Sequence, residues 1–265
     1  MFYGLATGKI DAGELEIEPV AAPLPALNDR ASRGELEVTM ISAAAYAYLQ
    51  DRYVLARCGA CFASERGPVL AAREPISETD LARASVAVPD VTSSATLALQ
   101  LNRPGVRTRL LPADKITQAA KMGLADCALL IDGNSAAFRQ SGLYCVADLA
   151  VGWAQQTGDL PLPLTCLAIR NDLDEPLRLR IESVLRASIR YGVKHRAEAA
   201  RFTVKVAPNG SAAELDPAAL GVCVTDSTVE MDPPGRHALE ELLRRGHDAD
   251  ILPNALPLRF VGSSA

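Results

Sequence analysis

The sequence predicts a two-lobed α/β protein with a helical C-terminal tail. Short apolar runs alternate with helix-forming segments, a second set of the same kind follows Pro75, and the pattern turns largely helical from Glu175. Alternating strands and helices favour a sheet with helices on its faces. We therefore expect residues 1–83 and 175–265 to form one discontinuous lobe and residues 84–174 to form the other.

The first lobe is predicted from apolar runs long enough for strands. The opening segment has the pattern of a helix end closed by Gly8. The alanine-rich segment 42–51 is expected to be helical, because alanine has the highest helix propensity. Strands are expected at 15–20, 36–41, 53–58 and 68–73.

The second lobe repeats this organisation. Ser77 and Asp80 have the spacing of a capping box at the start of a short helix. A turn-rich stretch is expected after residue 132, and a proline-punctuated extended segment at 160–172. Strands are expected at 85–89, 106–112 and 125–132, and helices at 95–102 and 113–123.

The tail is predicted to be helical from its capping and its apolar spacing. Pro176 and Pro233 stand where prolines begin helices. Leu239, Leu242 and Leu243 form an apolar stripe, as in a helix with one buried face. We expect this tail to pack back on the first lobe.

Charge and composition exclude several partners. The chain has 27 basic and 32 acidic residues and a net charge of −5, which argues against nucleic acid. It has no basic segment followed by an apolar signal region, and no apolar run that could span a bilayer. Its six cysteines are scattered among apolar residues, as reduced thiols are. We expect a cytoplasmic protein with no membrane partner.

Two similar corners are candidates for binding a small molecule. The strand at 36–41 leads into Ser42, and the strand at 85–89 leads into Ser93 and Ser94, each before a helix. Ligands gather beyond the carboxyl ends of parallel strands, and helix starts attract carboxylates and phosphates. The alternative is plain helix capping, because serine is a common N-cap. Facing lobes would bring both corners to one cleft that holds a small polar molecule.

Asp132 is a third candidate, and metals are disfavoured. Asp132 stands at the carboxyl end of the strand 125–132 and could act as a base or a ligand contact, although an aspartate also starts common turns. Cys58 and Cys61 have C-x-x-C spacing, but no second pair or histidine lies within metal-ligand spacing. Glycine-rich phosphate loops are absent, which disfavours ATP and NAD.

Several runs of the sequence form a specific set of motifs. They are FYGLATGKI, EPV, ALN at 26–28, GELEVTMIS, AYAYLQDRY, GPVLAAR, TGDLPLPLT and GRHALEELLRRGHDADILP. Together, from Met1 to about Val261, they resemble the 1,4-dihydroxy-6-naphthoate synthase family of the futalosine route to menaquinone.

The resemblance implies a periplasmic-binding-protein type II fold in a cytoplasmic enzyme. It implies cleavage of cyclic dehypoxanthinylfutalosine to 1,4-dihydroxy-6-naphthoate, with no metal or organic cofactor. The family's substrate-binding positions fall on Met40, Ile41 and Ser42 at the first corner and on Ser93 and Ser94 at the second.

The sequence departs from the family at three places. An N-terminal strand and a loop close to SPCPNDTF are missing, and we expect a start placed too late, the alternative being a genuine loss. Asp132 stands where the family has its histidine base, and VTDSTVE at 224–230 replaces a motif close to VNxYTLD. An aspartate titrates near about 3.9 and an imidazole near about 6.5, so Asp132 is the weaker base unless burial raises its pKa.

Two hypotheses follow from the resemblance. The first is the naphthoate synthase or an enzyme for a closely related substrate, with Asp132 as its base. The second is a catalytically impaired paralogue that binds a small polar or aromatic carboxylate in the same cleft. Chorismate dehydration, a sister activity on the same fold, fits the motifs less well.

Overall fold

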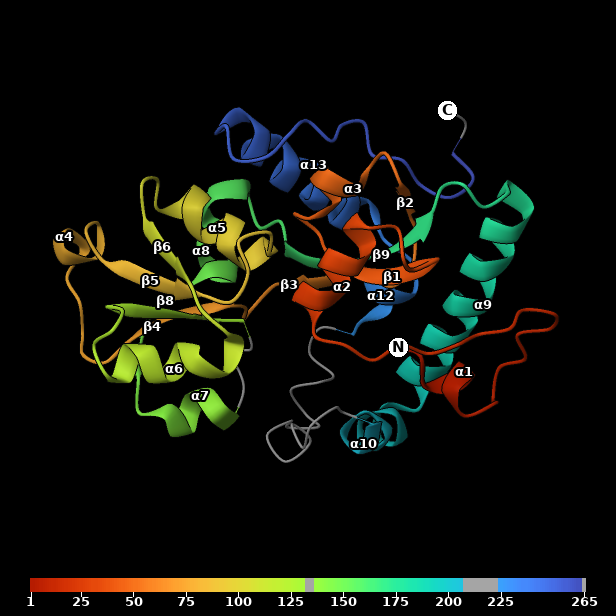
Figure 1. The fold of residues 1–265 in the computed structure, drawn as a ribbon, viewed down its shortest axis with the longest axis horizontal. Helices are drawn as coiled ribbons and strands as arrows, with labels where there is room; N and C mark the ends of the chain where they lie inside the picture. The colour runs from red at the N-terminus through yellow and green to blue at the C-terminus, as the bar shows by residue number, and fades with distance from the viewer. Residues whose placement is uncertain (132–135, 207–223, 264–265) are drawn as a thin grey trace.

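Two β-sheets with helices around them form two lobes that lie side by side (Figure 1). This computed structural model describes residues 1–131, 136–206 and 224–263. The mixed sheets and their flanking helices confirm the predicted α/β class.

The sheet of the first lobe is organised around one long strand. β9 (Leu162–Arg170) pairs antiparallel with β1 (Val38–Ser42), β2 (Tyr53–Leu55) and β3 (Cys61–Ala63). β1 lies on one side of β9, whereas β2 and β3 pair with different parts of it. Every other strand of this sheet therefore depends on β9 for its ladder of hydrogen bonds.

The sheet of the second lobe has five strands in the order β6-β5-β7-β4-β8. β5 runs parallel to β6 and β7, whereas β4 runs antiparallel to β7 and β8. The strands are β4 (Val69–Ala72), β5 (Ser85–Val88), β6 (Arg107–Leu110), β7 (Cys127–Leu130) and β8 (Tyr144–Asp148).

Two strands lie in a different sheet from the one that the expected lobe boundaries imply. β4 was expected within 1–83 but pairs in the second sheet, and β9 was expected within 84–174 but pairs in the first. Strands are assigned to a sheet by their ladder partners, and here the chain crosses between the sheets before β4 and again before β9. Neighbourhood in the sequence does not reveal such crossings.

Helices surround both sheets (Figure 1). In the second lobe α5 and α8 lie over one face of the sheet, and α6 covers the other with α7 beyond it. The helices are α1 (Tyr3–Ala6), α2 (Leu24–Ser32), α3 (Tyr46–Leu49), α4 (Glu78–Leu81), α5 (Ser94–Asn102), α6 (Ala113–Lys121), α7 (Ala136–Ser141), α8 (Leu149–Thr157), α9 (Glu175–Lys194), α10 (Arg196–Val206), α12 (Asp226–Val229) and α13 (Pro233–Asp248). Within the described ranges, none of them is both long and apolar enough to cross a bilayer.

The strand predicted at 15–20 is wrong. These residues belong to no strand, and Ile17 and Val20 are 50% and 43% exposed. Pro19 lacks the N–H group that a ladder needs, so it disfavours a paired strand. The structure also contains α2 and α8, for which the sequence pattern predicts no helix, and α7 occupies part of the stretch expected to be turns.

The tail helix α13 confirms the predicted apolar stripe. Leu239, Leu242 and Leu243 are at most 1% exposed and belong to the largest core cluster. Asp232 caps the helix by accepting a hydrogen bond from Gly235 N at 2.8 Å. α13 contacts both β9 and α5, so the tail packs on both lobes rather than on the first alone.

Candidate functional site

The two predicted corners meet where the lobes touch. Ala44 N, in the turn after β1, donates a hydrogen bond to Ser94 Oγ at 3.1 Å. Ser94 Oγ in turn donates to the carbonyl of Leu164 on β9 at 2.9 Å. We call this region the interlobe junction and define it as Asn28, Ser42–Ala44, Asp90–Ser94 and Leu164.

Ser42 ends β1 and is held by a side chain from α2. The residue is 1% exposed, and its N–H donates to Asn28 Oδ1 at 2.9 Å. Ser42 Oγ accepts a hydrogen bond from Asn28 Nδ2 at 3.0 Å. Ile41 is fully buried in the largest core cluster, whereas Met40 packs against the smaller cluster beneath α1 and α9. Met40 and Ser42 therefore share one face of β1, and Ile41 lies on the other.

Ser93 and Ser94 have different partners at the start of α5. Ser93 is the N-cap, because its Oγ accepts from Thr96 N at 3.1 Å. The capping interpretation therefore holds for Ser93. Ser94 uses its hydroxyl both as donor and as acceptor toward lobe one. Its hydroxyl joins the lobes.

Asn28 is a junction residue that is not among the predicted site residues. It is 6% exposed. Its Nδ2 donates to Asp90 Oδ2 at 3.1 Å and makes a longer hydrogen bond to Thr92 Oγ1 at 3.4 Å. Asp90 Oδ1 accepts from Thr92 N at 2.8 Å. Asn28 thus links α2 to the loop after β5. The ALN run at 26–28, one of the motifs of the resemblance, was the available signal.

Asp132 lies outside the described residues, whereas the strand that leads to it is described. β7 runs parallel to β5, with Val86 opposite Cys127 and Ala87 opposite Ala128. The carboxyl ends of β5 and β7 therefore lie at the same edge of the sheet. At that edge the chain continues from β5 to Asp90 and from β7 to Ile131.

The described cysteines and histidines do not form a metal centre. Burial, reinforced by the charge of Glu182, raises the pKa of Cys58 to about 12, and a thiol that stays protonated is neither a ligand nor a nucleophile. His195 stacks on Tyr191, with ring centroids 4.0 Å apart. Over the parts of the chain that the structure describes, no three His, Cys, Asp or Glu residues are placed to hold a metal ion.

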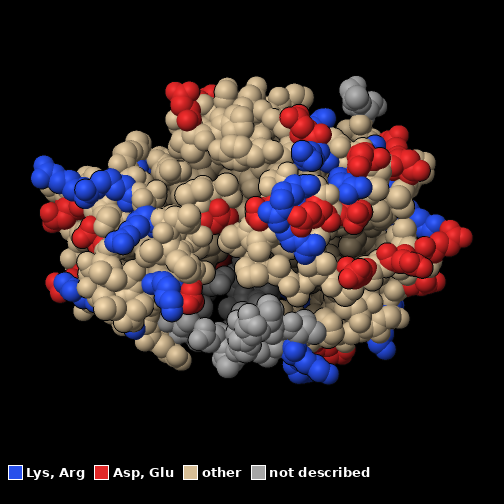
Figure 2. Space-filling model, viewed as in Figure 1, with Lys and Arg blue, Asp and Glu red and all other residues tan. Residues whose placement is uncertain are grey.

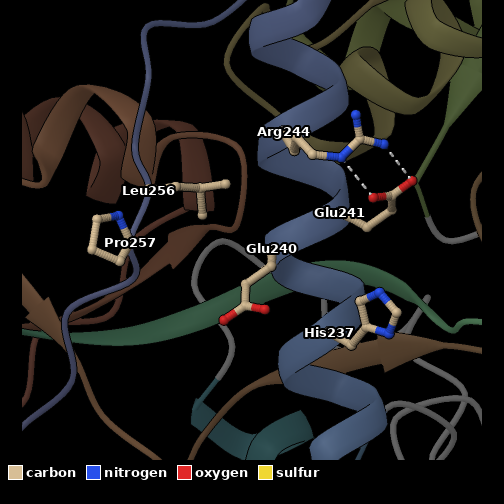
Figure 3. Close-up of a pocket in the computed structure, with 6 residues that line it drawn as sticks. All are labelled: His237, Glu240, Glu241, Arg244, Leu256 and Pro257. Atoms are coloured by element: carbon tan, nitrogen blue, oxygen red, sulfur yellow. Dashed lines mark hydrogen bonds and ion pairs between the residues drawn. The ribbon is translucent and has the colours of Figure 1, made fainter.

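Two surface cavities lie apart from the predicted site residues. The larger, of about 560 Å³, lies beside α13, where Glu241 pairs with Arg244 at 2.8 Å (Figure 3). The smaller, of about 250 Å³, includes Arg33 and Arg170, each of which is paired with carboxylates. On the face drawn in Figure 2, basic and acidic side chains are interspersed. The arginines named at both cavities are therefore already paired with carboxylates of this chain.

Comparison with known proteins identifies the family. A family model described as menaquinone biosynthesis matches residues 1–248. The chain belongs to this family. A Streptomyces coelicolor protein named 1,4-dihydroxy-6-naphthoate synthase is 31% identical over 263 residues, which cover 96% of this chain and 90% of that protein. A Thermus thermophilus protein of the same name is 34% identical over 199 residues, which cover 75% of this chain and 72% of that one.

Solved structures confirm the expected fold. Protein AF1704 from Archaeoglobus fulgidus matches with a TM-score of 0.86 and 33% identity, covering 95% of this chain and 93% of that one. The alkanesulfonate-binding protein SsuA from Xanthomonas axonopodis pv. citri matches with a TM-score of 0.61 and 14% identity, covering 89% and 85%. This chain thus has the two-lobed fold seen in periplasmic binding proteins.

Proposed function

We propose that this chain is a 1,4-dihydroxy-6-naphthoate synthase, which cleaves cyclic dehypoxanthinylfutalosine in menaquinone biosynthesis. One observation carries the proposal beyond family membership. The substrate positions implied by the resemblance come from both lobes, and Ser42 and Ser94 both belong to the interlobe junction. A site assembled from two lobes can enclose a substrate and exclude water when they close.

The junction offers polar groups that suit an oxygen-rich substrate. At the start of α5, the N–H groups of Ser94 and Ala95 have no acceptor within the helix. Together with the partial positive charge of the helix start, they favour a carboxylate or another anionic oxygen. Ser42 Oγ accepts from Asn28, so the Ser42 hydroxyl proton is directed away from the amide. Met40 contributes shape on the same face of β1 as Ser42, whereas Ile41 anchors the strand in the core from the other face.

We assign the role of general base to Asp132, from its place in the chain directly after Ile131. A positioned base abstracts the proton whose removal starts the cleavage, and losing such a base costs a factor of about 10²–10⁴. Burial would have to raise the pKa of this aspartate for it to act near neutral pH.

The test is turnover of cyclic dehypoxanthinylfutalosine by the purified protein, with the naphthoate product measured by chromatography. We expect Asp132→Asn to lower kcat by about 10²–10⁴-fold. Asp126→Asn is the matched control, because Asp126 precedes β7 and is exposed on the surface. Asp132→His should raise activity at neutral pH. Substrate binding without product, by the wild type, would contradict the proposal and indicate an impaired paralogue.

We also propose a cytoplasmic location. The support is that the described cysteines are unpaired, as expected in a reducing compartment. Fractionation of the source cells tests this, and recovery of the protein in the periplasmic or secreted fraction would contradict it.

A further inference from the structure

One buried hydroxyl of β9 has no nitrogen or oxygen atom as a hydrogen-bond partner. The Oγ1 atom of Thr165 is inaccessible to solvent, and among the described residues only the thiol of Cys61 is a polar neighbour for it. Burying a hydroxyl without a partner costs free energy, so native proteins nearly always satisfy such groups. This atom therefore needs an explanation from its surroundings.

The strand register places Thr165 directly beside Ser42. The two residues are opposed partners in the antiparallel ladder of β1 and β9. Opposed residues have their side chains on the same face, with Cβ atoms about 4.5–5.5 Å apart. The preceding residue, Leu164, accepts the hydrogen bonds from Ala43 N and Ser94 Oγ that close the interlobe junction. Thr165 thus lies at the edge of that junction.

On its other side Thr165 is opposed to Cys61 of β3. Burial raises the pKa of the Cys61 thiol, and a hydrogen bond from the Thr165 hydroxyl lowers it. The net shift is upward, so the thiol remains protonated, and a protonated thiol is a weak acceptor. The Thr165 hydroxyl can therefore exchange this weak partner for a stronger acceptor.

Ser42 and Thr165 together present two hydroxyl donors. Ser42 Oγ already accepts from Asn28 Nδ2, so its remaining capacity is to donate its own proton. Thr165 has its proton to donate as well. Two neighbouring donors on one face of the sheet match an acceptor with two oxygens. A carboxylate is that acceptor, since it accepts only and forms charge-assisted hydrogen bonds.

We propose that Thr165 is a substrate-binding, specificity-determining residue that donates, together with Ser42, to the carboxylate of the substrate. This inference rests on the proposed function, because that function supplies a substrate and a naphthoate product that carry a carboxylate.

The test compares Thr165→Val with the wild type. Valine keeps the shape and removes only the hydroxyl. Hydrogen bonds to charged groups contribute enough that we expect the KM for substrate and the Kd for the naphthoate product to rise about 10- to 100-fold. We expect kcat to change much less, because this contact is made in both the ground state and the transition state. Thr165→Ser should restore tight binding.

Two controls separate binding from structure. Thr39→Val removes another buried hydroxyl of this sheet, one that donates to Met40 O at 3.0 Å, and should leave the Kd unchanged. 1,4-Dihydroxynaphthalene, which lacks the carboxylate, should bind the wild type and Thr165→Val equally under anaerobic conditions. Thr165→Val should not lower the Tm, because it removes a buried hydroxyl whose partner is only a weakly accepting thiol.

The possible results are distinguishable. Turnover with equal Kd values for the wild type and Thr165→Val would overturn the assignment of Thr165 and leave the proposed function standing. A Tm loss in Thr165→Val with unchanged Kd, or equal weakening of 1,4-dihydroxynaphthalene, would also overturn it. Absence of both turnover and product binding in the wild type would overturn the proposed function and this assignment with it.

Discussion

Replacing Asn28 by alanine tests whether the interlobe junction holds the lobes together. The amide accepts from Ser42 N at 2.9 Å and donates to Ser42 Oγ at 3.0 Å and Asp90 Oδ2 at 3.1 Å. Without it, the N–H group of Ser42, a residue only 1% exposed, is left without its acceptor. An unsatisfied buried group costs about 1–3 kcal/mol, and a lost hydrogen bond to a charged group adds a similar amount.

The expected loss is therefore about 2–6 kcal/mol in the free energy of unfolding. For a chain of this size that corresponds to a Tm lower by about 4–24 °C. Urea unfolding measures it, and the single tryptophan, Trp153, reports the transition because it is 3% exposed in the native core. Far-UV circular dichroism should give the same midpoint if unfolding is two-state.

Asn171→Ala is the matched control for this experiment. Its amide makes one side-chain hydrogen bond, to the carbonyl of Asp51 at 2.8 Å, on the exposed side of the first lobe. We expect a loss of about 1 kcal/mol or less. Equal losses in Asn28→Ala and Asn171→Ala would refute the reasoning, because the junction would then contribute no more than a surface contact.

Three further predictions concern Ser94, Asp126 and the thiols. Ser94→Ala removes the acceptor of Ala44 N and the donor to Leu164 O and should lower the free energy of unfolding by about 1–3 kcal/mol, measured in urea. Hydrogen bonds from Ser85 hold the pKa of Asp126 below its ordinary value. Asp126 therefore stabilises the fold above the unfolded-state pKa of about 3.9, and this contribution is lost as the pH falls through the folded-state pKa. The wild type should thus lose its stability advantage over Asp126→Asn in acid titrations followed by urea unfolding. In a Cys223→Ser background, DTNB at pH 8 should label the exposed Cys145 rapidly and the buried cysteines only on unfolding.

Each of these predictions can fail in a defined way. A Ser94→Ala variant as stable as the wild type would show that water replaces the hydroxyl bridge. A stability difference between wild type and Asp126→Asn that stays constant from pH 7 to pH 3 would contradict the linkage. Rapid labelling of more than one thiol in the native protein would contradict the burial of Cys166, whose pKa burial raises to about 12.

Local periodicity predicted the elements better than their arrangement. The stripe of Leu239, Leu242 and Leu243 and the strand cores at 36–41 and 85–89 are buried as expected, because their spacing alone fixes one face. The partners of β4 and β9 were beyond prediction, because a strand's neighbours are chosen by the sheet and not by its own residues. Residues 15–20 alternate like a strand, yet nothing pairs with them.

The sequence indicated which positions belong to the candidate site, but not which of them are in contact. Ser42 and Ser94 could be found from strand ends and helix starts, but the hydrogen bond between Ala44 and Ser94 joins residues 50 apart in the chain. Asn28 had a signal only as part of a motif. Thr165 had none, because its buried hydroxyl stands out only by the partners that the tertiary structure gives it.

The position of β9 in the chain has a consequence for the order in which the two lobes fold during translation. The strands of the second sheet lie within residues 69–148, so all of them leave the ribosome before β9, at 162–170. The strands of the first sheet, although made mostly earlier, have no ladder until β9 arrives. We expect the second lobe to fold first, with residues 38–63 waiting as unpaired strands that a chaperone could shield. Nascent chains arrested before residue 162 should show a protease-resistant second lobe and a protease-sensitive first one.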